Sequence, residues 1–330
     1  MKNLNLFREV PFILRLTSND ETFRFAALDI ERNRLFFLSS HNFIYTYHLS
    51  SFHDKEAWSN ASLLSTDYGS VDLEPDDSVT SFDYLMEKEA LLLGTSNGLL
   101  LLYDVDANTT QVVGNLDGGV NCISLSPDGE LLAIITGFGQ ILVMTHDWDL
   151  LYETPLVVDD DVPQGHHING ENFLEGGFEQ HPISWRGDGK YFATMSVCSS
   201  TFLRKLKVWD RDSGALLASS DEKTFAGAVL EWMPSGAKIA AVYDRKAENE
   251  CSSIVFFERN GLERSKFSVG EGVNAKVKFL KWNCSSDLLA GVVECESYDA
   301  IKIWYFSNNH WYMKHEIRYL KQDEVRFIWN

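Results

Sequence analysis

The sequence has no uninterrupted apolar run that approaches the roughly 20 residues needed for a membrane-spanning helix. Its amino terminus lacks the continuous apolar segment and the small-residue cleavage site of a secretion signal. Cysteine is scarce too, with five residues, an odd number, and no CxxC pair. We therefore expect a soluble protein with reduced thiols and no membrane partner, located in the cytoplasm, with the nucleus as a further compartment.

Basic charge is also in short supply. Lys and Arg number 29 against 48 Asp and Glu, which gives a formal net charge of −19. Such a chain lacks the broad positive field that binding to nucleic acid requires. Two basic clusters lie along apolar segments, and each fits either a local nucleic-acid contact or outward-facing strand residues that discourage edge pairing; they are Arg204, Lys205 and Lys207, and Lys276, Lys278 and Lys281.

Motifs for catalysis are missing. There is no Gly-x-Ser-x-Gly nucleophile elbow, and Gly137-Phe-Gly139 is too short for a dinucleotide or phosphate loop. The adjacent pair His166-His167 has neither zinc nor calcium ligand spacing and is typical of a solvated loop. The sequence thus predicts a protein that is not an enzyme, with no catalytic residues, no cofactor and no metal.

What the chain does contain is a repeat. A buried-type residue, a turn and an apolar run recur at intervals of 41 to 60 residues, which is the signature of a repeat architecture. The anchors of the seven units are Leu28, Tyr84, Leu125, Trp185, Trp232, Trp282 and Trp329.

Each unit reads as a series of antiparallel strands. The clearest copy, Val120–Thr136, alternates apolar and polar residues, turns at Asp128-Gly129 and enters a second apolar run. The segment Tyr84–Leu93 has high helix propensity, but it fills the same slot and is expected to form strand, turn, strand. Third strands are expected in Leu99–Asp104, Ile141–Met144, Leu206–Asp210, Ile254–Phe257 and Ile301–Tyr305. A fourth strand follows turns such as Asn260-Gly261, for which we predict a type I′ hairpin.

Four antiparallel strands per unit make a propeller blade. Trp209-Asp210, with Tyr103-Asp104 in the same slot, matches the dipeptide that ends the third strand of WD40 repeats. The fold class is therefore all-β: a WD40-type β-propeller with six complete four-stranded blades plus the start of a seventh, at Glu324–Asn330. We expect residues 1–330 to be one truncated domain, marginally stable alone, with a strand from Leu4–Arg15 completing the last blade.

Two acidic insertions, at about 54–78 and 157–180, account for the longer intervals between anchors. The first holds seven acidic residues against one lysine and the second holds six with no Lys or Arg, so together they carry 12 of the 19 net negative charges. Either they keep exposed loops solvated or they dock a basic partner.

Candidate partner-contact residues lie in the second insertion and in two turns. These turn residues fit either recognition of a partner or formation of the turn itself. The candidates are Asp159, Asp160, Asp161, Arg186, Asp188, Arg259 and Asn260.

Three segments carry a family resemblance. Phe256–Leu262 (Phe-Phe-Glu-Arg-Asn-Gly-Leu) is the most specific, and it is supported by Ile183–Ala193 and by Met1–Phe7. They resemble the amino-terminal WD40-like region of the largest subunit of Elongator, over residues 1–330.

The resemblance implies a scaffold that supports modification of the tRNA wobble uridine (U34). Its partners would be other Elongator subunits, namely the catalytic subunit and the second WD40 subunit. It would contact tRNA only indirectly, and the iron–sulfur, S-adenosylmethionine and acetyl-CoA sites would belong to the catalytic subunit. By the same resemblance, we expect the family's homodimerisation region and basic tRNA-binding segment to be absent from this chain. A generic WD40 adaptor and a propeller hydrolase are the alternatives.

Overall fold

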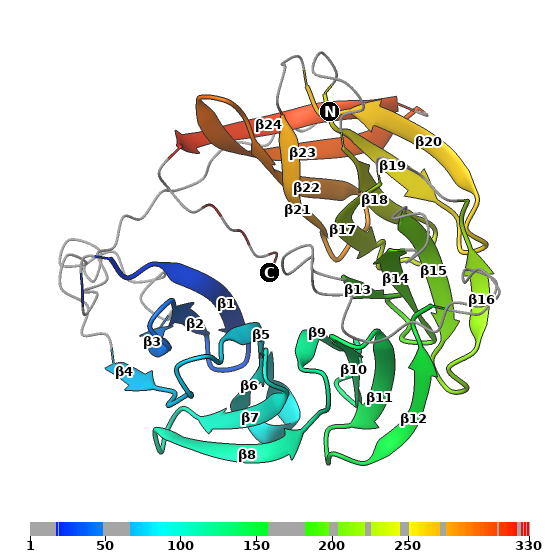
Figure 1. The fold of residues 1–330 in the computed structure, drawn as a ribbon. Coiled ribbons are helices and arrows are strands. Elements are labelled where there is room, and N and C mark those ends of the chain that lie inside the picture. The colour runs from blue at the N-terminus through cyan, green and yellow to red at the C-terminus, as the bar shows by residue number, and fades with distance from the viewer. Residues whose placement is uncertain are drawn as a thin grey trace. The chain divides into compact units, whose positions relative to one another are not determined.

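A computed structural model describes residues 18, 20–48, 67–157, 182–197, 204–221, 226–244, 251–270, 275–308, 310–321, 325, 327 and 329. In these ranges the chain forms 24 strands and one short 3₁₀ helix. The strands make six four-stranded sheets, each an antiparallel meander in which strands consecutive in sequence are neighbours (Figure 1).

The sheets are numbered in chain order. Sheet 1 comprises β1 (Phe23–Asp29), β2 (Arg34–Ser39), β3 (Phe43–His48) and β4 (Asp67–Ser70). Sheet 2 comprises β5 (Val79–Leu85), β6 (Ala90–Thr95), β7 (Leu99–Asp104) and β8 (Thr109–Asn115), with the 3₁₀ helix η3 (Met86–Lys88) between β5 and β6. Sheet 3 comprises β9 (Val120–Leu125), β10 (Leu131–Thr136), β11 (Gln140–Thr145) and β12 (Leu150–Pro155).

The remaining three sheets follow the same plan. Sheet 4 comprises β13 (Ile183–Trp185), β14 (Tyr191–Val197), β15 (Arg204–Asp210) and β16 (Leu216–Ser219). Sheet 5 comprises β17 (Ala226–Trp232), β18 (Ile239–Tyr243), β19 (Ser253–Phe257) and β20 (Glu263–Ser268). Sheet 6 comprises β21 (Lys276–Trp282), β22 (Leu288–Glu294), β23 (Tyr298–Ser307) and β24 (His310–Leu320).

The repeat prediction is confirmed for six units. The first six anchors all lie in the first strand of a sheet, and every predicted third strand lies in the observed third strand. The segment Tyr84–Leu93 forms strand, turn, strand as expected, with the single turn of η3 in the turn slot. Cross-strand packing therefore prevails over local helix propensity in this segment.

Contacts divide the chain into two compact units, with the boundary between Ile123 and Ser124 inside β9. The amino-terminal unit contains sheets 1 and 2. The carboxyl-terminal unit contains sheets 4 to 6 and the part of sheet 3 from Ser124 onward. A single domain over residues 1–330 stays a prediction.

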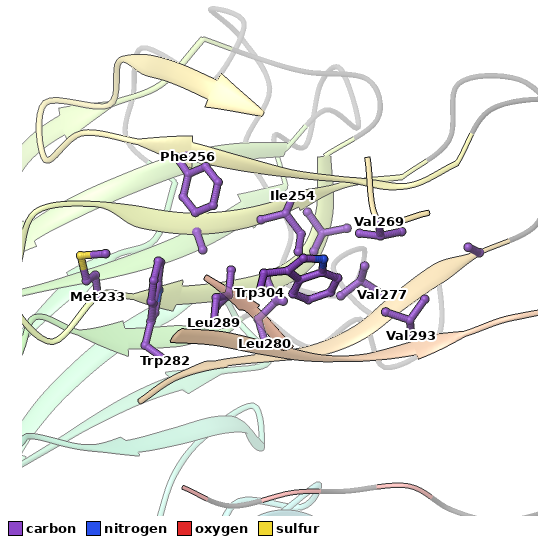
Figure 2. Close-up of a cluster of buried hydrophobic side chains, with 13 residues drawn as sticks. Met233, Ile254, Phe256, Val269, Val277, Leu280, Trp282, Leu289, Val293 and Trp304 are labelled. Atoms are coloured by element: carbon purple, nitrogen blue, oxygen red, sulfur yellow. The ribbon is translucent and has the colours of Figure 1, made fainter. Parts of the chain in front are cut away.

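Each unit has an apolar core between neighbouring sheets. Sheets 1 and 2 share a cluster that includes Phe36, Tyr84 and Leu93. In the carboxyl-terminal unit, sheets 5 and 6 share a cluster that includes Phe256 and Trp282, which Figure 2 shows in the layer between the two sheets. Burial of each large apolar side chain of this kind contributes about 1.5–3 kcal/mol to stability.

The predicted type I′ hairpin at Asn260-Gly261 is wrong. Only Gly261 has a positive φ, of 81°, whereas a type I′ turn needs positive φ at both central residues. The Gly261 amide donates to the Glu258 carbonyl oxygen at 2.9 Å, and the register of β19 and β20 shifts between Phe256 and Phe257. The Glu258 amide also donates to the Leu262 carbonyl oxygen at 3.0 Å, so the loop has three residues and Gly261 is its one left-handed position.

Two of the basic strand residues that were expected to face outward are buried, and one of them is Arg204, which is 9% exposed. Lys207 was expected to face outward, but it is 1% exposed and its Nζ donates to the Leu156 carbonyl oxygen at 2.8 Å. Lys302 occupies the equivalent position in sheet 6 and donates to the Val269 carbonyl oxygen at 3.1 Å. Both lysines lie in a third strand, which is packed on both faces, so the ammonium group is satisfied by a backbone acceptor.

Two further predictions concern the first acidic insertion and the amino-terminal strand. Within the insertion expected at 54–78, Asp67–Ser70 forms strand β4 paired with β3, so the loop is shorter than predicted. The strand expected from Leu4–Arg15 lies outside the described residues.

At the carboxyl end, the described positions 325, 327 and 329 are not assigned to a strand. Trp329 nevertheless makes a contact seen elsewhere in the repeat. Its Nε1 donates to the Lys281 carbonyl oxygen at 3.0 Å, as Trp185 Nε1 donates to the Ser124 carbonyl oxygen at 3.2 Å. In both cases the acceptor immediately precedes an anchor residue, Trp282 or Leu125.

Candidate functional site

In a four-stranded meander, the connection between strands 1 and 2 and the connection between strands 3 and 4 lie at the same end of the sheet. We call this end of each sheet its turn edge. In sheets 3, 4 and 5 the first of these connections is the same turn, closed by a glycine amide with positive φ that donates three residues back. The pairs are Gly129 with Ser126, Gly189 with Arg186 and Gly236 with Met233. Equivalent residues of different sheets can therefore be identified by the number of residues that separate them from the anchor in the sequence.

The turn edges of sheets 3 and 4 are joined by an arginine. Arg211, which follows β15, pairs with Asp128, and its Nη2 lies 2.8 Å from Oε2 of Glu130. Burial alone would raise the pKa of the Asp128 carboxyl, but hydrogen bonds from Ser126 and Arg211 outweigh it and hold the pKa below its usual value. The Tyr152 hydroxyl donates to the Arg211 carbonyl oxygen at 2.6 Å, which fixes the same connection from another side.

At the turn edges of sheets 4 and 5, the structure brings together three of the candidate residues. The guanidinium carbon of Arg259 lies 5.1 Å from the centroid of the Tyr191 ring, and that of Arg186 lies 5.5 Å from it. Asp188 is 3.6 Å from Arg186 Nε. Both arginines are at cation–π distance from one tyrosine, although they are 73 residues apart in sequence.

Asn260, the fourth turn candidate, maintains the turn instead. Its Oδ1 accepts a hydrogen bond from the Leu262 amide at 3.0 Å. Glu258, at the start of the same connection, is bound by Arg264 through Nε at 2.7 Å. Arg259, Asn260 and Leu262 are the exposed residues of this connection, and Leu262 is 49% exposed.

The sequence interpretation missed a related contact between sheets 5 and 6. Lys238 Nζ lies 4.1 Å from the centroid of the Phe306 ring, and burial lowers the pKa of its ammonium group. Lys238 is six residues after Trp232, as Tyr191 is six residues after Trp185. The spacing from the anchor was the signal that identifies this position.

A buried ion pair in the amino-terminal unit was also missed. Arg34 is 5% exposed and Asp29 is 1% exposed, with Arg34 Nε 3.0 Å from Asp29 Oδ2. Arg34 Nη1 also lies 3.0 Å from Asp106, in the connection after β7. Burial alone would raise the pKa of Asp29, but hydrogen bonds from the Arg32 amide and from Arg34 hold it below its usual value.

The acidic candidates Asp159, Asp160 and Asp161 lie outside the described residues, and docking of a basic partner there stays a prediction. Strand β12 precedes this insertion and β13 follows it, so it connects two sheets. Within the first insertion, Asp77 is part of the fold: its Oδ1 accepts from the Ser96 hydroxyl and the Asn97 amide, both at 2.9 Å.

In the described ranges, no group of three or more His, Cys, Asp or Glu side chains is arranged to hold a metal ion. No helix in the same ranges is both long enough and apolar enough to cross a membrane.

Comparison with known proteins gives one consistent family. The model of the ELP1 first N-terminal beta-propeller matches residues 1–180 and 175–330. Elongator complex protein 1 of Arabidopsis thaliana is 54% identical over 334 residues, covering 100% of this chain and 25% of that protein. The Rattus norvegicus protein of the same name is 30% identical over 282 residues, covering 74% of this chain and 21% of that protein.

The fold is also similar to a solved structure. A chain of a structure titled "Crystal Structure of Mitotic Checkpoint Complex" aligns with a TM-score of 0.61 and 14% identity, over 99% of this chain and 90% of that one. At this identity the likeness shows the fold alone. Among the sequence relatives, this chain spans about a quarter of the Arabidopsis protein and 21% of the rat protein.

Proposed function

This chain belongs to the family of the first amino-terminal β-propeller of ELP1, and from that membership we propose that it is a non-catalytic protein-interaction module of the Elongator complex. The observation that carries the proposal is the match of the family model across residues 1–330. The identity of 54% to the Arabidopsis protein over the whole chain supports it.

The turn edges suit such a role. Adjacent sheets of the carboxyl-terminal unit are linked there by ion pairs and ring contacts, so the loops that follow the third strands are held in place. A loop that is already ordered loses little entropy when it binds, and this favours recognition of a partner. Arg186, Asp188 and Arg259 lie at these edges, with Arg259 exposed.

We propose further that the module supports modification of the tRNA wobble uridine through its partners, the catalytic subunit and the second WD40 subunit. A net charge of −19 disfavours direct binding of tRNA, so contact with tRNA would be indirect. The proposed location is the cytoplasm, with the nucleus as a further compartment. Docking of a basic segment on Asp159, Asp160 and Asp161 belongs to the same proposal.

The test is co-purification from cells of the source organism. The tagged chain is expected to recover other Elongator subunits, identified by mass spectrometry. The corresponding region of the Arabidopsis protein, expressed in its own cells, is the matched positive control. Recovery of Elongator subunits with the control but of an unrelated complex with this chain would contradict the proposal and favour a generic adaptor.

A further inference from the structure

One arginine position is shared by two junctions between sheets. Trp209 and Phe257 each pair with the residue that lies seven positions after the anchor of their own sheet, Phe192 and Ile239 respectively. They are therefore equivalent, and so are the residues two positions later, Arg211 and Arg259. Each of these arginines reaches the turn edge of the preceding sheet.

The two arginines meet different partners. Arg211 faces Asp128 and Glu130, which lie three and five residues after Leu125 and both pair with it. The residues three and five after Trp185 are Asp188 and Lys190. The two positions that provide carboxylates to Arg211 are thus occupied, in the sheet that Arg259 reaches, by one carboxylate residue and one lysine.

The remaining carboxylate is turned elsewhere. Asp188 Oδ1 lies 3.6 Å from Arg186 Nε, and it accepts from the Lys190 amide at 3.2 Å. In the described part of the chain, Arg259 contacts the Tyr191 ring and has no carboxylate partner. Its guanidinium thus sits on a tyrosine at a position where the equivalent arginine is doubly ion-paired.

We propose that Arg259, Tyr191 and Arg186 form a docking site for an acidic peptide, whose carboxylate side chains take the place that Asp128 and Glu130 take around Arg211. The planar guanidinium of Arg259 binds a carboxylate in bidentate fashion, and the Tyr191 ring keeps that plane oriented. Lys190 adds a third positive charge beside the turn. The exposed Leu262 offers an apolar contact for a neighbouring side chain of the peptide.

The size and surroundings of the site favour a peptide over a nucleic acid. The proposed site has three basic residues, one of them ion-paired with Asp188, and Asp128, Glu130 and Glu258 lie in the adjoining connections. A long polyphosphate would extend over these carboxylates on a chain of net charge −19, whereas a short acidic peptide ends before them.

The test uses the intact protein and a fluorescein-labelled hexaglutamate peptide, with binding followed by fluorescence anisotropy. The peptide is expected to bind, with affinity that falls as salt concentration rises. Arg259→Ala should weaken binding about tenfold, because a charge-assisted bidentate pair is lost. Lys266→Ala is the matched control and should leave the affinity nearly unchanged, since it removes one positive charge from an exposed position of β20.

A second variant tests the comparison between the two junctions. Lys190→Glu restores at sheet 4 the carboxylate that Glu130 provides at sheet 3, so it should supply Arg259 with an internal partner and weaken peptide binding as Arg259→Ala does. Lys266→Glu makes the same change in charge on an exposed position of β20 and should have a much smaller effect.

The proposal would be overturned by equal binding to the parent protein and Arg259→Ala, or by equal effects of Lys190→Glu and Lys266→Glu. Absence of hexaglutamate binding to the parent protein would also overturn it. Tighter binding of a hexauridylate RNA that is lost in Arg259→Ala would assign the site to nucleic acid instead. Co-purification of Elongator subunits is read out separately, so either proposal can fail alone.

Discussion

Trp329 donates a hydrogen bond from its indole Nε1 to the backbone carbonyl oxygen of Lys281, at 3.0 Å. Lys281 precedes the anchor Trp282 of sheet 6 in the same way that Ser124 precedes the anchor Leu125 of sheet 3. Trp185, the anchor of sheet 4, donates in the same way from Nε1 to the Ser124 carbonyl oxygen of sheet 3. Trp329 therefore makes with sheet 6 the contact that the anchor of sheet 4 makes with sheet 3. The sequence pattern that marked Trp329 as a seventh anchor therefore has a counterpart in a specific contact.

Loss of this donor is expected to cost stability. Trp185→Phe removes the indole N–H and should reduce the free energy of unfolding by about 1 kcal/mol beyond the loss of ring volume. Trp282→Phe is the matched control, because Trp282 Nε1 is buried and has no acceptor among the described residues. Urea unfolding measures both, and an equal loss in the two variants would show that the hydrogen bond to Ser124 contributes nothing.

The buried lysines should be sensitive to loss of charge. Lys207→Met keeps much of the side-chain volume but removes the donor to the Leu156 carbonyl oxygen. It is expected to lower the free energy of unfolding by about 1–3 kcal/mol, as is Lys302→Met for Val269. Lys266→Met, on an exposed position of β20, should stay within about 0.5 kcal/mol of the parent protein in the same urea titration. An equally small effect of Lys207→Met would contradict the inference that its hydrogen bond supports the fold.

Asp29 should make part of the stability depend on pH. Its pKa is lowered in the folded protein, so it stabilises the fold above its unfolded pKa, near 4, and this contribution is lost as pH falls further. Asp29→Asn leaves Arg34 buried without its partner and is expected to cost about 3 kcal/mol at pH 7. The difference from the parent protein should shrink between pH 5 and pH 2. The exposed Asp72→Asn serves as control, and a pH-independent difference for Asp29→Asn would refute the assignment.

A backbone prediction concerns Gly261. Its φ is +81°, and an added Cβ would lie 2.6 Å from the Ser219 carbonyl oxygen. Gly261→Ala should therefore destabilise the protein by about 1–2 kcal/mol. Gly114→Ala, whose Cβ would meet only the Leu100 side chain at 3.3 Å, should cost clearly less in thermal unfolding. If the two variants melt alike, the left-handed conformation at Gly261 is not required.

The sequence predicts the sheets well because each strand and turn is a local pattern. Anchors, second strands and third strands follow from alternation and spacing alone. Turn geometry is less accessible: Asn260-Gly261 matches a type I′ dipeptide, but Glu258 pairs with Leu262, so the loop has three residues and needs a positive φ only at Gly261. Burial of Lys207 was missed because its partner, the Leu156 carbonyl oxygen, is contributed by the preceding sheet.

The candidate site shows the same division. Arg186 and Arg259 were selected singly, as turn residues, and their meeting on Tyr191 depends on packing between two sheets. Local sequence carries no record of that contact. A comparison of positions relative to the anchors does carry it, since Tyr191, Lys238 and Arg34 all lie six residues after an anchor.

The common turn of sheets 3, 4 and 5 keeps one backbone conformation while its side chains differ from sheet to sheet. Its glycine and its three-residue hydrogen bond keep the backbone constant, whereas the side chains three and five positions after the anchor are free to change. A substitution at one junction can thus remove the internal carboxylate and leave the arginine available to an external ligand. The neighbouring junctions keep their internal ion pairs. The same turn site therefore occurs in several sheets with different side chains, and the copy beside Tyr191 is the one that we propose binds an acidic peptide.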